Sequence, residues 1–128
     1  MLTAEIICVG TELLMGQVLN TNEQFIASHL TEAGIALNHS SVVGDNPERL
    51  KELLELAKSR ADIIIMTGGL GPTDDDLTKE TVAEAFGKGL VFHAECMDNM
   101  VAYLKESGRN LPKNTEKQAY LPEGCIVI

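Results

Sequence analysis

The hydrophobic pattern of the chain changes between short continuous apolar runs and longer segments in which apolar residues recur every three or four positions. Residues 5–9 and 63–66 are continuous runs, which are typical of strands buried on both faces. The run at 63–66 contains three consecutive isoleucines and is predicted to be a central strand, because β-branched residues favour strands. Two further strands are expected, within 35–43 and at 125–128.

Helical spacing follows each of the first strands. The first helix is predicted to take its N-cap from residues 20–22 and to end at Gly34, and the second to begin at Pro47 after a cap at Asp45 or Asn46. Three more helices are expected to begin near residues 78, 94 and 114. Strands that alternate with helices predict an α/β fold with a mostly parallel sheet covered on both sides.

Composition narrows the class of protein. A chain of 128 residues is long enough for one domain with its own core. The formal net charge of −9 argues against a nucleic acid or an anionic membrane as partner, since both are polyanions. No signal peptide or spanning segment is recognisable, so a cytoplasmic location is expected. The odd number of cysteines, without metal-ligand spacing, predicts reduced core thiols at Cys8, Cys96 and Cys125.

The strongest candidate for chemistry is the glycine-rich loop that follows the isoleucine run. Its glycines allow positive φ and a close approach of the backbone, so that successive N–H groups can cradle a phosphate near a helix N-terminus. An ordinary tight turn is the alternative. A phosphate-bearing small molecule is therefore the expected ligand, and its predicted contacts in this loop are Thr67, Gly68, Gly69, Gly71, Pro72 and Thr73.

Three carboxylates, Asp74, Asp75 and Asp76, come directly after this loop and would repel a phosphate. A divalent cation such as Mg²⁺, held between the carboxylates and the phosphate, would remove that conflict. The alternative role for these side chains is to complement the N-terminal dipole of the next helix. Asp45 follows the second strand and is expected at the same edge of the sheet, as a ligand, as an N-cap, or as both.

The end of the first strand supplies another predicted wall of the site. Gly10, Thr11 and Glu12 follow that strand, and Asn20 and Asn22 are candidate polar contacts for the ligand, although helix capping explains either asparagine equally well. The three histidines have no spacing that suggests a metal site, and no nucleophile elbow is present. No general base is predicted.

Four segments together carry a resemblance to a known family: 9–17, 20–22, 43–46 and 67–78. With them, the whole chain resembles the N-terminal domain of the CinA competence/damage-inducible family, which is similar to the molybdopterin-binding fold of MogA, MoaB and MoeA proteins. The resemblance implies one molybdopterin-binding-like domain over 1–128, with a three-layer α/β/α fold. It also implies that the domain continues past the last predicted strand into a loop that completes the pocket.

The resemblance implies two alternative functions. One is a metal-dependent pyrophosphatase that converts ADP-ribose to AMP and ribose 5-phosphate, with Mg²⁺ or Co²⁺ held by Asp45, Asp75 and Asp76. The other is a non-catalytic module that binds molybdopterin or a nucleotide. The segment at 113–118 also looks like the family's, which adds Lys113 to the expected ligand contacts. Relatives assemble as dimers or trimers, so a homo-oligomer is expected.

Overall fold

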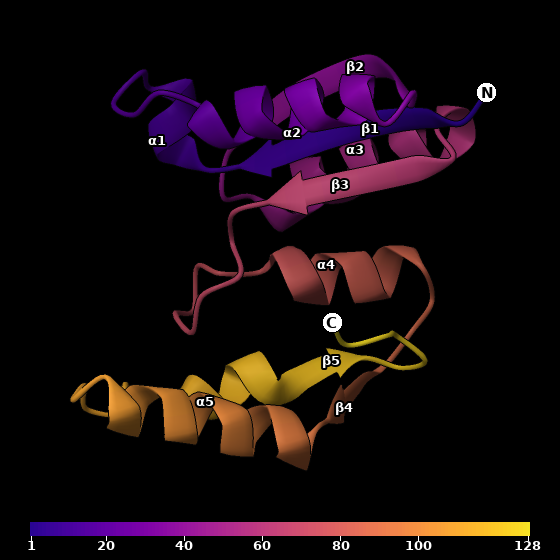
Figure 1. The fold of residues 1–128 in the computed structure, drawn as a ribbon. Helices are drawn as coiled ribbons and strands as arrows, with labels where there is room; N and C mark the ends of the chain where they lie inside the picture. Colours follow the sequence, from indigo (N-terminus) through magenta and orange to yellow (C-terminus); the bar gives the residue numbers. More distant parts are fainter. The chain divides into compact units, whose positions relative to one another are not determined.

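The computed structural model describes all residues from 1 to 128. They form two compact units, residues 1–69 and residues 70–128 (Figure 1), which are described separately. We call them the N-terminal unit and the C-terminal unit. No helix of either unit is long and apolar enough to cross a membrane.

The N-terminal unit is built on a parallel three-stranded sheet with the order β2-β1-β3. Its strands are β1 (Thr3–Val9), β2 (Ala36–Val43) and β3 (Ile63–Thr67). The predicted parallel arrangement is confirmed, but β3 is not the central strand of this sheet. That place belongs to β1, whose residues 4–9 are all buried, whereas every residue of β3 is half-buried. The β-branched run predicted a strand correctly, but it could not tell an edge position from a central one.

Helices cover both faces of this sheet (Figure 1), as predicted. On one face, α2 (Thr21–Glu32) packs Leu30 against Ala4, Ile6 and Cys8, which alternate along β1. On the other face lies α3 (Pro47–Arg60), which buries Leu50, Leu54 and Ala57. A one-turn helix that the pattern did not predict, α1 (Thr11–Leu14), follows β1 directly.

A buried ion pair ties α3 to β1. Glu5 is fully buried, and Arg60 donates to it twice, from Nη2 to Oε1 at 2.6 Å and from Nε to Oε2 at 2.9 Å. These hydrogen bonds lower the pKa of Glu5 against the opposing effect of its burial. The charged side chain of Glu5 is therefore buried in β1 with both of its carboxylate oxygens hydrogen-bonded to Arg60.

The C-terminal unit contains α4 (Thr78–Ala85), β4 (Leu90–Phe92), α5 (Ala94–Glu106), the 3-10 helix η1 (Thr115–Ala119) and β5 (Tyr120–Pro122). The strands β4 and β5 pair antiparallel. The strand predicted at 125–128 is wrong, because the last strand is β5 and the chain after Gly124 is irregular. Residues 90–92 and 120–122 are each only three residues long, too short to give a recognisable pattern.

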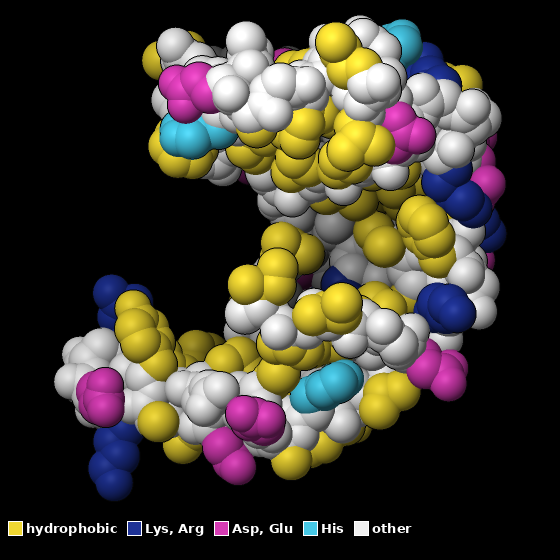
Figure 2. Space-filling view, turned by 45° about the vertical axis from the view of Figure 1, so that its right-hand side comes forward, with side chains coloured by type: hydrophobic (Ala, Val, Ile, Leu, Met, Phe, Trp, Pro, Cys, Tyr) yellow, Lys and Arg dark blue, Asp and Glu magenta, His cyan; other side chains and the backbone are white.

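The apolar face of α5 is not a core. Met97, Met100, Val101 and Leu104 have the helical spacing that predicts an inner, core-facing side, but none of the residues of α5 is buried and Val101 is exposed, so this prediction is wrong. Apolar side chains reach the surface elsewhere too, as the face drawn in Figure 2 shows. Of the three cysteines that were predicted to be core thiols, Cys8 is buried as predicted, but Cys96 is half-buried and Cys125 is exposed.

Candidate functional site

Loops that follow β1 and β2 meet at the carboxyl end of the N-terminal sheet. The N–H of Gly10 donates to the carbonyl of Val43 at 2.9 Å, which holds the ends of the two strands together. Beyond them, Thr11 donates from Oγ1 to Oδ2 of Asp45 at 3.2 Å, and the N–H of Asp45 donates to Oγ1 of Thr11 at 3.1 Å. The predicted meeting of Asp45 with residues 10–12 is therefore observed.

Asp45 does not cap α3. Asn46 takes that role, since its Oδ1 accepts from the N–H of Arg49 at 3.0 Å. The carboxylate of Asp45 lies instead near the start of α1, where it also accepts from the N–H of Thr11 at 3.4 Å. An exposed carboxylate held by Thr11 stays available to a ligand at this end of the sheet.

Gly68 belongs to the same end of the sheet. Its φ is +83°, and a Cβ built on it would lie 2.0 Å from the carbonyl oxygen of Val9 at the end of β1. Gly69 also has a positive φ, of 67°. The predicted positive φ is thus confirmed at both glycines, but the close approach at Gly68 is to the backbone of β1, and the predicted approach to a phosphate stays a prediction. Gly68, Gly10 and Asp45 lie at one end of one sheet.

Of the two candidate asparagines, Asn20 is a helix cap. Its Oδ1 accepts from the backbone N–H of Glu23 at 3.3 Å, which caps α2, and its Nδ2 donates to Oε2 of the Glu23 side chain at 2.9 Å. Asn22 lies exposed in the first turn of that helix. A ligand contact by either residue stays a prediction.

Within the C-terminal unit, the rest of the glycine-rich loop is a turn closed by Asp76. Oδ2 of Asp76 accepts from Oγ1 of Thr73 at 2.6 Å and from the N–H of Thr73 at 3.1 Å. The hydroxyl of Thr73 is the main reason that the pKa of Asp76 is lowered, with smaller contributions from its N–H, from Gly71 and from Lys117. A Cβ on Gly71 would lie 2.6 Å from the same oxygen, so this glycine makes room for the carboxylate.

Lys117 of η1 closes the turn from another side. Its Nζ donates to the carbonyl of Thr73 at 2.5 Å and also to the carbonyl of Asp76. Lys79 of α4 donates to the carbonyl of Lys117 and lies 3.8 Å from Oε1 of Glu80, and burial lowers the pKa of its ammonium. The ammonium groups of these two lysines therefore link η1, the turn and the first turn of α4.

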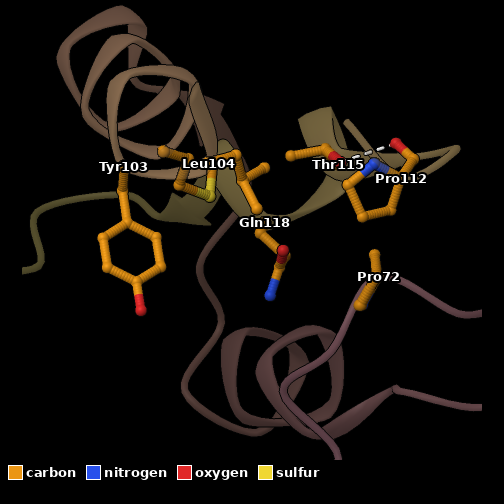
Figure 3. Close-up of a pocket in the computed structure, with 7 residues that line it drawn as sticks. Pro72, Tyr103, Leu104, Pro112, Thr115 and Gln118 are labelled. Atoms are coloured by element: carbon orange, nitrogen blue, oxygen red, sulfur yellow. Dashed lines mark hydrogen bonds between the residues drawn. The ribbon is translucent and has the colours of Figure 1, made fainter. Parts of the chain in front are cut away.

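A cavity of about 300 Å³ lies beside this turn, within the C-terminal unit (Figure 3). Pro72 contributes one wall from the glycine-rich loop, and Gln118 is held in place because its Nε2 donates to the carbonyl of Leu70 at 3.3 Å. Most of the lining is apolar, and the volume matches the lower end of small-molecule pockets. The remaining lining residues are Met100, Tyr103, Leu104, Pro112 and Thr115.

The predicted metal ligands are not gathered in either unit. Asp45 belongs to the N-terminal unit and Asp75 and Asp76 to the C-terminal unit, and neither unit alone brings three His, Cys, Asp or Glu side chains together in a way that could hold a metal ion. Asp74 and Asp75 are exposed, and so is Lys113. Lys117, Gln118 and the lining of α5 were missed as site residues, because they meet the loop only through the tertiary fold.

Comparison with known proteins assigns the chain to a family. The family model described as a probable molybdopterin binding domain matches residues 5–126. A crystal structure of the protein CinA from Thermoplasma acidophilum, described as of unknown function, is 33% identical with a TM-score of 0.82, and covers 97% of this chain and 72% of that one. The chain is a molybdopterin-binding-type domain of the CinA family.

Other relatives agree with this CinA domain. A putative competence-damage inducible protein of Clostridium acetobutylicum is 56% identical over 124 residues, which are 97% of this chain and 30% of that protein. The chain thus spans about a third of the length of such curated relatives. The molybdopterin biosynthesis enzyme MoaB from Thermus thermophilus is 27% identical with a TM-score of 0.62, and covers 66% of this chain and 54% of that one.

Proposed function

We propose that this CinA domain binds a small molecule that joins a phosphate or pyrophosphate to a flat heteroaromatic ring, such as molybdopterin or a nucleotide, without transforming it. The observation that carries the proposal is the double role of the glycine-rich loop. Asp76 closes the turn at 73–76 through its hydrogen bonds with Thr73, and Pro72, which comes just before that turn, is a wall of the apolar cavity. One ligand could therefore contact the turn with its phosphates and the cavity with its ring.

The cavity suits a ring more than a sugar or a peptide. Its walls include the exposed ring of Tyr103, on which a flat π-system can stack, and the side chains of Met100 and Leu104. The amide of Gln118 and the hydroxyl of Thr115 add a small number of polar groups. An apolar pocket with few polar groups is the usual composition of a site for a ring-bearing cofactor.

Molybdopterin is the first ligand to test, because the matching family model carries its name and because MoaB, a relative of similar fold, is named as a molybdopterin biosynthesis enzyme. Both statements describe those proteins, and they come to this domain as part of the proposal. The second ligand to test is ADP-ribose, which combines a pyrophosphate with an adenine ring.

Hydrolysis of ADP-ribose to AMP and ribose 5-phosphate is the second candidate function. It is favoured by the exposed carboxylate of Asp75 in the glycine-rich loop, since carboxylate oxygens are the ligands that Mg²⁺ prefers, and Co²⁺ would be the other ion to test. Asp76 fits a metal less well, because its Oδ2 already accepts two hydrogen bonds from Thr73. That oxygen is therefore already engaged within the turn.

Calorimetric titration of the chain with molybdopterin and with ADP-ribose, each in EDTA and in Mg²⁺ or Co²⁺, tests the proposal. We expect saturable binding of at least one ligand in EDTA and unchanged ligand at the end of the titration. Tyr103→Ala should weaken that binding, whereas Val101→Ala, an exposed position on the same helix outside the cavity, should leave it unchanged. Release of AMP from ADP-ribose would instead establish the hydrolase, and no binding of either ligand would contradict the proposal.

Two further expectations remain proposals. Assembly of identical chains into a dimer or trimer can be measured by light scattering on a sizing column, and a cytoplasmic location by fractionation of cells. Neither affects the residues assigned to the turn and the cavity.

A further inference from the structure

The side chain of Lys117 reaches the inside of the turn at 73–76, from a residue 44 positions away. Its ammonium donates to the carbonyl of Thr73 at 2.5 Å and to that of Asp76, which are the first and last residues of the turn. Lys117 is half-buried, and its own carbonyl is held by Lys79. Hydrogen bonds thus hold both the ammonium of Lys117 and its backbone carbonyl.

This contact decides which way the peptide groups of the turn face. In a trans peptide the carbonyl and the following N–H point in opposite directions, and the chain has no cis peptide. Because the carbonyls of Thr73 and Asp76 point at Lys117, the N–H groups of Asp74 and Leu77 point away from it. The lysine therefore turns these two backbone donors away from itself.

The ammonium of Lys117 also reduces the repulsion between the aspartates of the loop and a bound phosphate. Asp74, Asp75 and Asp76 would repel a phosphate, and a divalent cation is one way to neutralise them. Lys117 places a positive charge of the protein itself against two carbonyls of that turn. The charge of Lys117 also makes a small contribution to the lowering of the pKa of Asp76, after those of the hydrogen bonds from Thr73 and Gly71.

We propose that Lys117 is the positioning residue of the anion site, and that it allows the turn at 71–77 to bind pyrophosphate without a divalent metal. This inference rests on the proposed function, since it concerns the phosphate end of the same ligand. It assigns no transformation of the ligand. Lys117 acts through the backbone of the turn, by orienting its N–H groups, and through its charge.

Pyrophosphate binding to the 128-residue chain, measured by calorimetry, tests the inference. In EDTA, the wild type should bind, and added Mg²⁺ should not be required. Lys117→Met should weaken binding by about tenfold or more, which is the effect expected for loss of charge-assisted hydrogen bonds. Lys117→Arg should restore much of the affinity, because a guanidinium can also donate to two carbonyls. Lys105→Met, at an exposed lysine in the last turn of α5, is the matched control and should bind as the wild type does.

Each outcome decides a different statement. Binding by the wild type only in the presence of Mg²⁺ would overturn the inference and leave the proposed function standing, as would equal binding by Lys117→Met and the wild type. Failure of Lys117→Arg to bind better than Lys117→Met would show that the charge at 117 does not act on the ligand site. Should Lys117→Met not fold, the wild type in EDTA and Lys117→Arg still give the answer. No pyrophosphate binding under any condition would contradict the proposed function itself.

Discussion

Replacing Asp76 by asparagine tests whether the glycine-rich loop is held by the network seen around it. Oδ2 of Asp76 accepts two hydrogen bonds from Thr73, at 2.6 and 3.1 Å, and an amide keeps one acceptor oxygen but loses the charge. A hydrogen bond to a charged group stabilises by about 1.5–3 kcal/mol, and the partial exposure of this carboxylate reduces its effect. We therefore expect Asp76→Asn to lower the free energy of unfolding by about 1 kcal/mol at neutral pH.

The pH dependence of that loss identifies its cause. The pKa of Asp76 is lowered in the folded protein, so its carboxylate stabilises the fold above the ordinary aspartate pKa, and this stabilisation is lost as the pH falls through the folded value. Urea denaturation of both proteins between about pH 7 and pH 3 should show a constant difference near neutrality that shrinks in acid. Asp75→Asn, at an exposed neighbour, should cost less than about 0.5 kcal/mol. If Asp76→Asn and Asp75→Asn have the same free energy of unfolding at every pH, the hydrogen bonds between Asp76 and Thr73 do not stabilise the fold.

Three other predictions concern the loops and the ion pair that support the site. Gly68→Ala should lower the melting temperature more than Gly16→Ala, because both have positive φ but only the new methyl at 68 would meet the carbonyl of Val9, at 2.0 Å; equal losses would refute the close approach. Gly71→Ala should displace the carboxylate of Asp76, because the added Cβ would lie 2.6 Å from its Oδ2. In a double-mutant cycle, Asp76→Asn should therefore cost less stability in the Gly71→Ala background than in the wild type. Arg60→Met should destabilise the fold far more than Arg49→Met, because it leaves the buried Glu5 unpaired, and thermal unfolding of the two variants would check this.

Local patterns predicted those parts of the fold that neighbouring residues determine. The apolar runs at β1 and β3, the glycine ends at Gly34 and Gly87, and the meeting of three loops at one end of a parallel sheet all follow from period and turn chemistry. Asp45 was found as a site residue, but its partner is Thr11 and not the N-terminus of α3. The choice between two adjacent capping residues depends on a contact with a distant loop.

The contacts of η1 with the glycine-rich loop could not be predicted from the sequence. Lys117 and Gln118 meet the glycine-rich loop across 44 and 48 residues, and no spacing along the chain indicates this. The methionines of α5 have the spacing of a buried face, yet Met100 lines a cavity instead. Periodicity shows which side chains share a face of a helix, and the tertiary fold decides whether that face meets a core or a ligand site.

The most direct test of the central claim is a map of the ligand contacts by ¹H–¹⁵N correlation spectra of the chain in EDTA, titrated with whichever of molybdopterin and ADP-ribose binds tighter. We predict saturable shifts, with one dissociation constant, at the amides of Asp74 and Leu77 in the turn and of Tyr103 and Gln118 around the cavity. Saturable shifts confined to residues outside the turn and the cavity, or no shifts with either ligand, would contradict the claim that the turn and the cavity form one binding site.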